Sequence, residues 1–236
     1  MPYIHRKDCR MKRPVSSALL LTIIFLIAGA CMAVRAEDQP GPMPVRNDLV
    51  FLPAGQLADM IRKQQVSSSE VVEAYLARIE KHNKSLNAIV TLDAAGARRR
   101  AKEADEAIKK GEIWGPLHGV PITIKDNIAV AGMRTTSGVS ALADYVPDVD
   151  APVVERLRKA GAIIMGKTNL PVLAMDVQTS NPIFGRTNNP WDLSRTPGGS
   201  SGGAAAAIAA GLSALEIGND LAVPYAFRRT SVGFTG

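Results

Sequence analysis

The feature that most constrains the fold of this 236-residue chain is a glycine- and serine-rich run that leads directly into four alanines. Residues 197–203 read Pro-Gly-Gly-Ser-Ser-Gly-Gly, and residues 204–207 are all alanine. Glycine permits backbone dihedrals that other residues avoid, so the run predicts a tight loop that opens onto a helix. The start of that helix points unpaired N–H groups at any developing negative charge. Such a loop suits a serine hydrolase. The alternative is a flexible linker, although strong helix formers do not usually follow a linker at once.

A short strand upstream carries a lysine that is suited to act as a base. Apolar Val120, Ile122 and Ile124 alternate with other residues, which predicts a strand that ends near Lys125. Burial among apolar residues lowers the pKa of a lysine, and the neutral amine can then accept a proton. Lysine replaces histidine beside the serine in some variants of the catalytic triad. The alternative is an ordinary lysine at a strand end that extends its side chain along apolar surface and pairs with Asp126 or another carboxylate.

Four segments of the chain form a recognisable series in their order and spacing. They are GPLHGVPITIKDNI (115–128), AGAIIMGKTNLPVLAMD (160–176), NPIFGRTNNPWD (181–192) and RTPGGSSGGAAAA (195–207). Together they resemble the amidase signature family of C–N hydrolases. The resemblance covers most of residues 50–222, which is about the N-terminal half of a typical member.

The resemblance implies a fold, a mechanism and a set of site residues. The fold is an α/β architecture with a mixed sheet covered by helices. The mechanism uses a Ser–Ser–Lys triad, in which Lys125 is the general base and Ser200 is the bridging serine of a cis peptide. The resemblance assigns the shaping of the substrate pocket to Gly199, Ser201, Gly202 and Asp220.

The segment in which the family carries its nucleophile departs from the family pattern. Residues 218–227 begin with the matching Gly-Asn-Asp-Leu-Ala but lack the Gly-Ser-hydrophobic-Arg that should follow. Aligned without a gap, Pro224 stands where the nucleophile belongs, and proline has no nucleophilic side chain. Ser213 and Ser231 lack the matching context. The sequence therefore predicts a C-terminally truncated amidase domain from which the nucleophile is missing.

Residues 1–36 have the pattern of a secretory signal peptide. They contain six basic residues and one acidic residue, an apolar run over 18–30, and small residues before a cleavage position after Ala36. Two alternatives stay open: lipid attachment at Cys31 and an uncleaved membrane anchor over residues 18–34. We therefore expect an exported protein, periplasmic or secreted, with membrane attachment through this segment as the alternative. Because Cys9 and Cys31 both lie in the leader, cleavage would leave no cysteine for a disulfide.

Beyond the leader, the chain alternates helical and strand patterns. Residues 37–53 predict an extended linker, and residues 54–236 predict the partial amidase domain. Ser67 and Glu70 form a capping-box pattern at the start of a helix. Further helices are predicted over 93–110, 153–160 and 204–210, and strands over 162–165 and 215–217. This alternation is typical of α/β proteins.

Charge and motif spacing argue against several other functions. The net charge of +6 falls almost entirely in the leader, so the sequence predicts no nucleic-acid partner. Residues 161–168 fit the letters of a nucleotide-binding P-loop, but a predicted helix precedes them and a predicted strand occupies their middle. The histidines lack the spacing of metal ligands, and His118 is interpreted as a structural residue in a turn. We expect neither a metal nor a cofactor.

Three functional hypotheses follow from these patterns. The first is an amidase-family hydrolase of a small carboxylic amide, impaired because its nucleophile segment is missing. The second is a truncated relic that cannot bury its apolar surface. The third is a pseudoenzyme that binds an amide or a carboxylate without turnover. The sequence leaves the substrate and the oligomeric state open.

Overall fold

The computed structural model describes residues 48–220. The predicted leader, most of the predicted linker and the segment around Pro224 lie outside these residues. Among the described residues, no helix has both the length and the apolar character that crossing a membrane requires.

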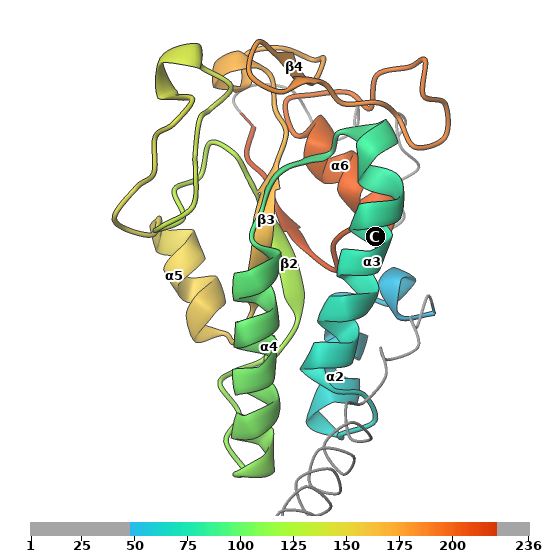
Figure 1. Ribbon diagram of the computed structural model, residues 1–236, viewed down its shortest axis with the longest axis vertical. Helices are drawn as coiled ribbons and strands as arrows, with labels where there is room; N and C mark the ends of the chain where they lie inside the picture. Colours follow the sequence, from blue (N-terminus) through green and yellow to red (C-terminus); the bar gives the residue numbers. More distant parts are fainter. Residues whose placement is uncertain (1–47, 221–236) are drawn as a thin grey trace, which may run out of the picture. The chain divides into compact units, whose positions relative to one another are not determined.

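Helices and strands alternate along the described chain (Figure 1), as the sequence predicts. The α-helices are α2 (Ala54–Arg62), α3 (Ser68–Leu86), α4 (Ala94–Lys109), α5 (Pro152–Lys159) and α6 (Gly202–Ala209). The strands are β1 (Ile89–Leu92), β2 (Pro121–Lys125), β3 (Ile163–Thr168), β4 (Ser180–Asn181), β5 (Gly185–Arg186) and β6 (Glu216–Ile217). Short 3₁₀ helices are η1 (Leu49–Phe51), η2 (Ser140–Leu142) and η3 (Val172–Ala174).

The main sheet is mixed, which confirms the predicted α/β fold class. Its strand order is β1-β3-β2-β6, with β1 antiparallel to β3 and both other pairs parallel. Strands β4 and β5 form a separate antiparallel pair. Every residue of β2 and of β3 is buried, as expected for parallel strands covered by helices. The centre of the sheet is therefore a dry environment for any polar side chain that it carries.

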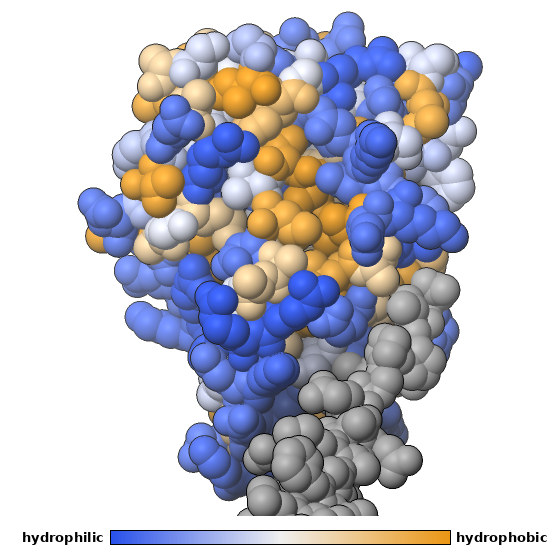
Figure 2. Space-filling model, viewed as in Figure 1, coloured by the Kyte–Doolittle hydropathy of each residue, from blue (hydrophilic) through white to orange (hydrophobic). Residues whose placement is uncertain are grey.

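Helices pack against the strands of this sheet. Helix α4 packs on α3 and β3, and α6 packs on β2, β3 and β6. In Figure 1, α4 lies in front of the two central strands, with α5 on one side and α3 on the other. Hydrophilic residues dominate the surface over α4, whereas apolar residues gather at the centre of the face shown in Figure 2. The charged run of α4 is thus a solvated helix face.

The start of α3 confirms the predicted capping box. The Ser67 hydroxyl accepts a hydrogen bond from the Glu70 backbone N–H (3.1 Å), and the Glu70 carboxylate accepts one from the Ser67 N–H (2.8 Å). Asp105 of α4 also accepts hydrogen bonds from the Ser68 N–H (2.6 Å) and the Ser69 N–H (3.1 Å). These bonds pair N–H groups that the first turn of a helix leaves without a partner inside the helix.

The folded region begins earlier than the linker predicted over residues 37–53 allows. Leu49 and Val50 form part of η1 and are buried in the hydrophobic core, where the Tyr75 hydroxyl donates to the Val50 carbonyl at 3.2 Å. The proline-rich and polar composition of the segment concealed an apolar pair that α3 covers. The boundary predicted at residue 54 is therefore too late.

Candidate active site

Lys125 ends β2 with its side chain completely buried, and its Nζ donates a 2.7 Å hydrogen bond to Ser200 Oγ. The strand explains this placement. Successive side chains alternate between the faces of a sheet, so Lys125 shares a face with Thr123 and, by register, with Thr168 of β3. Ser200 approaches the same face from the loop before α6. The structure thus brings together the two residues that the sequence predicts as catalytic, 75 positions apart.

The serine loop has the backbone that the resemblance implies. The peptide bond between Gly199 and Ser200 is cis, and Ser200 and Ser201 are each only 2% exposed. The Ser201 hydroxyl donates to the Asn219 carbonyl at 3.2 Å, and Lys125 Nζ donates to the same carbonyl at 2.8 Å. The Asn219 carbonyl therefore joins Lys125 to the serine loop, a contact that the sequence did not predict.

Two glycines of this loop pack closely against the segment 176–179 of the protein. A Cβ at Gly199 would lie 2.6 Å from the Asp176 carbonyl oxygen, and one at Gly202 would lie 2.2 Å from the Thr179 hydroxyl. That hydroxyl donates to the Gly198 carbonyl at 2.8 Å and accepts from the Gly202 N–H at 3.0 Å. Close packing against residues 176–179 accounts for these glycines. A contact of Gly199 or Gly202 with substrate stays a prediction.

The start of α6 differs from the sequence expectation. Its first two N–H groups already have partners inside the protein, because Gly202 donates to Thr179 and Gly203 donates to the Asn169 carbonyl at 3.3 Å. These two groups therefore do not point unpaired at a substrate. Asp220 directly follows Asn219 and is partly exposed, and its predicted substrate contact is likewise untested.

Sequence reasoning missed Glu216, an acidic residue on β6. Its carboxylate accepts hydrogen bonds from the hydroxyls of Thr123 on β2 and Thr168 on β3, the latter at 2.6 Å. Both threonines are completely buried. Burial raises the pKa of the Glu216 carboxyl from 4.5 to about 7, against the opposing effects of the two hydroxyls and of Lys167 and Lys125. A glutamate within the apolar segment 215–217 was the available signal.

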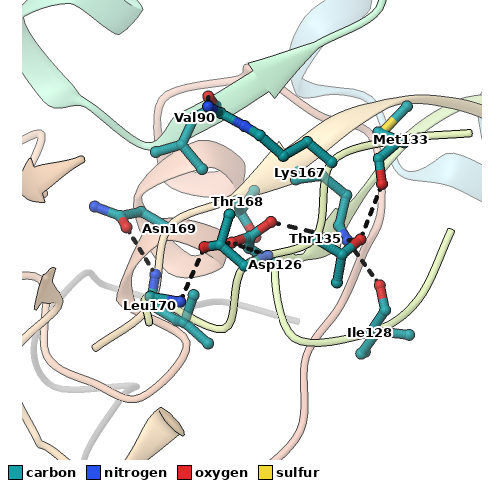
Figure 3. A network of polar contacts seen from close by, with 12 residues as sticks. Val90, Asp126, Ile128, Met133, Thr135, Lys167, Thr168, Asn169 and Leu170 are labelled. Atoms are coloured by element: carbon teal, nitrogen blue, oxygen red, sulfur yellow. Dashed lines mark hydrogen bonds and ion pairs between the residues drawn. The ribbon is translucent and has the colours of Figure 1, made fainter. Parts of the chain in front are cut away.

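A second buried lysine lies at the next strand (Figure 3). Lys167 Nζ donates to the Ile128 carbonyl at 2.7 Å and to the Thr135 hydroxyl at 2.8 Å, and it lies 3.9 Å from Asp126 Oδ1. Burial lowers the pKa of Lys167 to about 8, although Asp126 and Glu216 oppose the shift. The pKa of Asp126 is raised by burial. Lys167 pairs with Ile124 in the parallel register, so it lies on the opposite face of the sheet from Lys125.

The contacts of Asp126 lead to Thr136 and Lys167, whereas those of Lys125 lead to Ser200 and Asn219. The Asp126 carboxylate accepts from the Thr136 N–H (3.1 Å) and the Thr136 hydroxyl (2.5 Å), and its ion-pair partner is Lys167.

The P-loop-like segment and His118 both have structural roles. Residues 163–168 of the P-loop-like segment form the fully buried strand β3, so they cannot wrap a phosphate. His118 is completely buried, with Nδ1 accepting from the Trp114 N–H and Nε2 bonded to the Ala104 carbonyl, both at 3.0 Å. Both ring nitrogens are used internally, as expected of a structural histidine. Within residues 48–220, no three His, Cys, Asp or Glu residues could together hold a metal ion.

The raised pKa of Glu216 predicts a specific dependence of stability on pH. Between pH 4.5 and 7 the native carboxyl keeps its proton while that of the unfolded chain has lost it. The native state then binds more protons, so the contribution of Glu216 to the free energy of unfolding falls as pH rises through this window. We expect the difference in the free energy of unfolding between the parent and Glu216→Gln to fall by about 3 kcal/mol from pH 4.5 to pH 7.5. Urea denaturation of both proteins at a series of pH values measures this difference. A difference that stays flat would contradict the assignment.

The fold and this constellation define a class of protein: a mixed α/β domain that buries a lysine against a serine of a cis Gly–Ser peptide, just before a helix. Comparison with known proteins agrees with that class. The profile of the Amidase family matches residues 70–222. The chain belongs to the Amidase family, the amidase signature group of enzymes.

Relatives of established identity show how much of the family domain is present. The chain is 46% identical over 173 residues to the A subunit of glutamyl-tRNA(Gln) amidotransferase from Carboxydothermus hydrogenoformans, an alignment that covers 73% of this chain and 36% of that protein. The corresponding protein of Thermoanaerobacter pseudethanolicus is 47% identical, with 73% and 35% covered. The chain therefore spans about a third of the length of these relatives.

Solved structures support the same conclusion. The structure of 6-aminohexanoate cyclic dimer hydrolase matches with a TM-score of 0.63 and 36% identity, over 70% of this chain and 33% of that one. Fatty acid amide hydrolase matches with a TM-score of 0.71 and 26% identity, over 89% of this chain and 36% of that one.

Proposed function

We propose that the protein is a hydrolase of small carboxylic amides in which Lys125 and Ser200 form the proton relay. The observation that carries this proposal is the 2.7 Å hydrogen bond between Lys125 Nζ and Ser200 Oγ. Both side chains are almost completely buried. A buried amine that loses its proton can accept one from the serine hydroxyl, and the serine can in turn accept one from the attacking group.

The nucleophile is the incomplete part of the proposed machinery. The sequence after Asp220 lacks the Gly-Ser-hydrophobic-Arg that the family resemblance leads us to expect, and in an alignment without a gap Pro224 stands at the position of the serine. We therefore propose that acyl transfer to a serine is impaired in this chain, and that the relay activates a water molecule for direct attack on the amide carbon. Loss of the nucleophile from a serine hydrolase removes most of its rate enhancement and leaves a residual part.

The proposed substrate class is a small amide rather than an amide carried on RNA. The names of the structural relatives refer to hydrolysis of a fatty acid amide and of a cyclic dimer of 6-aminohexanoate, both amide bonds. The amidotransferase relatives are named instead for glutamyl-tRNA(Gln). Outside residues 1–36 this chain is close to neutral, which gives little attraction for a polyanion.

The test is the release of ammonia from simple primary amides, such as propionamide and benzamide, by the purified full chain. We expect slow release above the protein-free rate, reduced to that rate by Lys125→Ala and by Ser200→Ala. The matched control is Lys159→Ala, an 80% exposed lysine whose loss should change nothing. Release that survives Lys125→Ala would refute the relay.

A pseudoenzyme is the second candidate, and the missing serine motif favours it. In that case the same amides bind saturably without ammonia release, and Ser200→Ala abolishes the binding. Calorimetric titration of the parent and the Ser200→Ala variant with benzamide distinguishes the two functions.

A further inference from the structure

We infer that Glu216 is a positioning residue for the Lys125 site. Its carboxylate holds β6 against both β2 and β3, and this places the Asn219 carbonyl within hydrogen-bond distance of the Lys125 amine. This inference rests on the proposed role of Lys125 as the base. It concerns a residue that the Lys–Ser relay itself does not use.

Strand β6 has little backbone pairing of its own to fix its position. It has two residues and pairs with β2 through Thr123 opposite Glu216 and Ile124 opposite Ile217. One further backbone bond, from the Thr123 N–H to the Leu215 carbonyl at 3.2 Å, precedes this pair. Because a strand this short forms few ladder bonds, its register depends on side-chain contacts.

The Glu216 carboxylate provides such a contact across three strands. One oxygen accepts from Thr123 on the adjacent strand, and the other accepts from Thr168 one strand further away. Hydrogen bonds to an ionised acceptor are roughly twice as strong as neutral ones. The two completely buried threonines offer little freedom to follow a displaced carboxylate. The carboxylate thus fixes β6 against both central strands.

The position of β6 in turn determines the position of Asn219, which follows Glu216 by three residues. The Asn219 carbonyl accepts from Lys125 Nζ (2.8 Å) and Ser201 Oγ (3.2 Å), and its side-chain oxygen accepts from Asn127 Nδ2 (3.1 Å). A slip of one residue moves a strand by about 3.3 Å, which would break all three bonds. Glu216 therefore acts on the base through Asn219.

The charges around the carboxylate are consistent with this role. Lys125 on β2 and Lys167 on β3 are the cations that act on Glu216, and both stabilise its ionised form. Helix α6, which packs on β6, carries no charged residue. The hydroxyls of Thr123 and Thr168 likewise favour the ionised carboxylate, so the contacts that hold β6 are made to an acceptor that its surroundings support.

The first experiment is hydrogen exchange on the full chain at pH 8, comparing the parent with Glu216→Gln. If Glu216 positions β6, exchange at residues 216–219 accelerates at least tenfold more than exchange at residues 163–165 of β3. The matched control is Asp105→Asn, which also removes a carboxylate bound to a serine hydroxyl (2.6 Å from Ser69 Oγ) but lies on α4. In that variant the ratio between the two segments should stay unchanged. Equal acceleration in both segments, or none at 216–219, would overturn the inference.

A second pair of variants covers the case in which Glu216→Gln does not fold. Thr168→Val keeps the shape of the side chain and removes the donor, whereas Thr168→Ser keeps the donor. We expect Thr168→Val to accelerate exchange selectively at 216–219 and to shift the ¹³Cε resonance of Lys125, assigned with Lys125→Met. Thr168→Ser should do neither, and identical behaviour of the two variants would overturn the inference. None of these readouts requires turnover, so a failure of the ammonia assay would refute the proposed function separately.

Discussion

Replacing Lys167 with methionine is expected to lower the free energy of unfolding by about 3–5 kcal/mol at pH 7. Methionine fills a similar volume, but it removes the ammonium group that lies 3.9 Å from Asp126 Oδ1. That oxygen is buried and accepts no hydrogen bond from any described residue, so the Lys167 charge is what compensates it. The substitution also leaves the Ile128 carbonyl and the Thr135 hydroxyl without this donor. A buried charge that loses its partner costs far more than a surface pair does.

Two controls isolate the ion pair from other effects of the substitution. Lys159→Met removes an exposed lysine 3.8 Å from Glu155 and should change stability by less than about 0.5 kcal/mol. The double variant Lys167→Met/Asp126→Asn removes both charges and should be more stable than Lys167→Met alone. Urea denaturation at pH 7 measures all three. If the double variant is no more stable than Lys167→Met, the loss comes from packing or from the other two hydrogen bonds.

The parts of the fold that the sequence predicts are those that depend on neighbouring residues. The capping box of Ser67 and Glu70 and the strand ending at Lys125 are both local patterns, and both are confirmed. The proximity of Lys125 and Ser200 is a long-range contact, and it was predicted from the family resemblance rather than from any local pattern. Hydrophobic periodicity does not show which distant residues meet, and in this case the family resemblance supplied that information.

The missed residues are polar groups whose partners lie far away in sequence. Lys167 drew attention only as a letter of a P-loop-like motif, whereas its partners Ile128 and Thr135 lie 39 and 32 positions earlier. Glu216 meets Thr123 from 93 positions away. A charged residue inside an apolar strand signals that compensation must exist, but only the strand order shows which residue provides it.

Gly203 and Gly55 each lie in the first turn of a helix, but replacing them with alanine should change the free energy of unfolding in opposite directions. We expect Gly203→Ala to destabilise the protein by about 3 kcal/mol. A Cβ at Gly203 would lie 2.4 Å from both the backbone nitrogen and the carbonyl oxygen of Asn169. Gly55, which is likewise the second residue of its helix, has no atom within 4 Å of the corresponding position.

Asn169 cannot easily move away from the added methyl group. Its N–H donates to the Ala88 carbonyl at 2.9 Å, its side-chain oxygen accepts from Asn181 at 2.7 Å, and its amide donates to the Thr187 hydroxyl at 3.0 Å. The start of α6 must therefore shift instead. Because Ser200 and Ser201 immediately precede α6, that shift should also lengthen the bond between Ser200 and Lys125.

The control at Gly55 separates this clash from the general preference of helices for alanine. Alanine is favoured over glycine in a helix by about 1 kcal/mol, so Gly55→Ala should be neutral or stabilising by up to that amount. Thermal and urea denaturation of the two variants and the parent give the comparison. If Gly203→Ala were as stable as Gly55→Ala, α6 could not approach Asn169 this closely. The glycines at residues 202 and 203 would then have to be explained by the approach of a substrate rather than by the packing of the protein on itself.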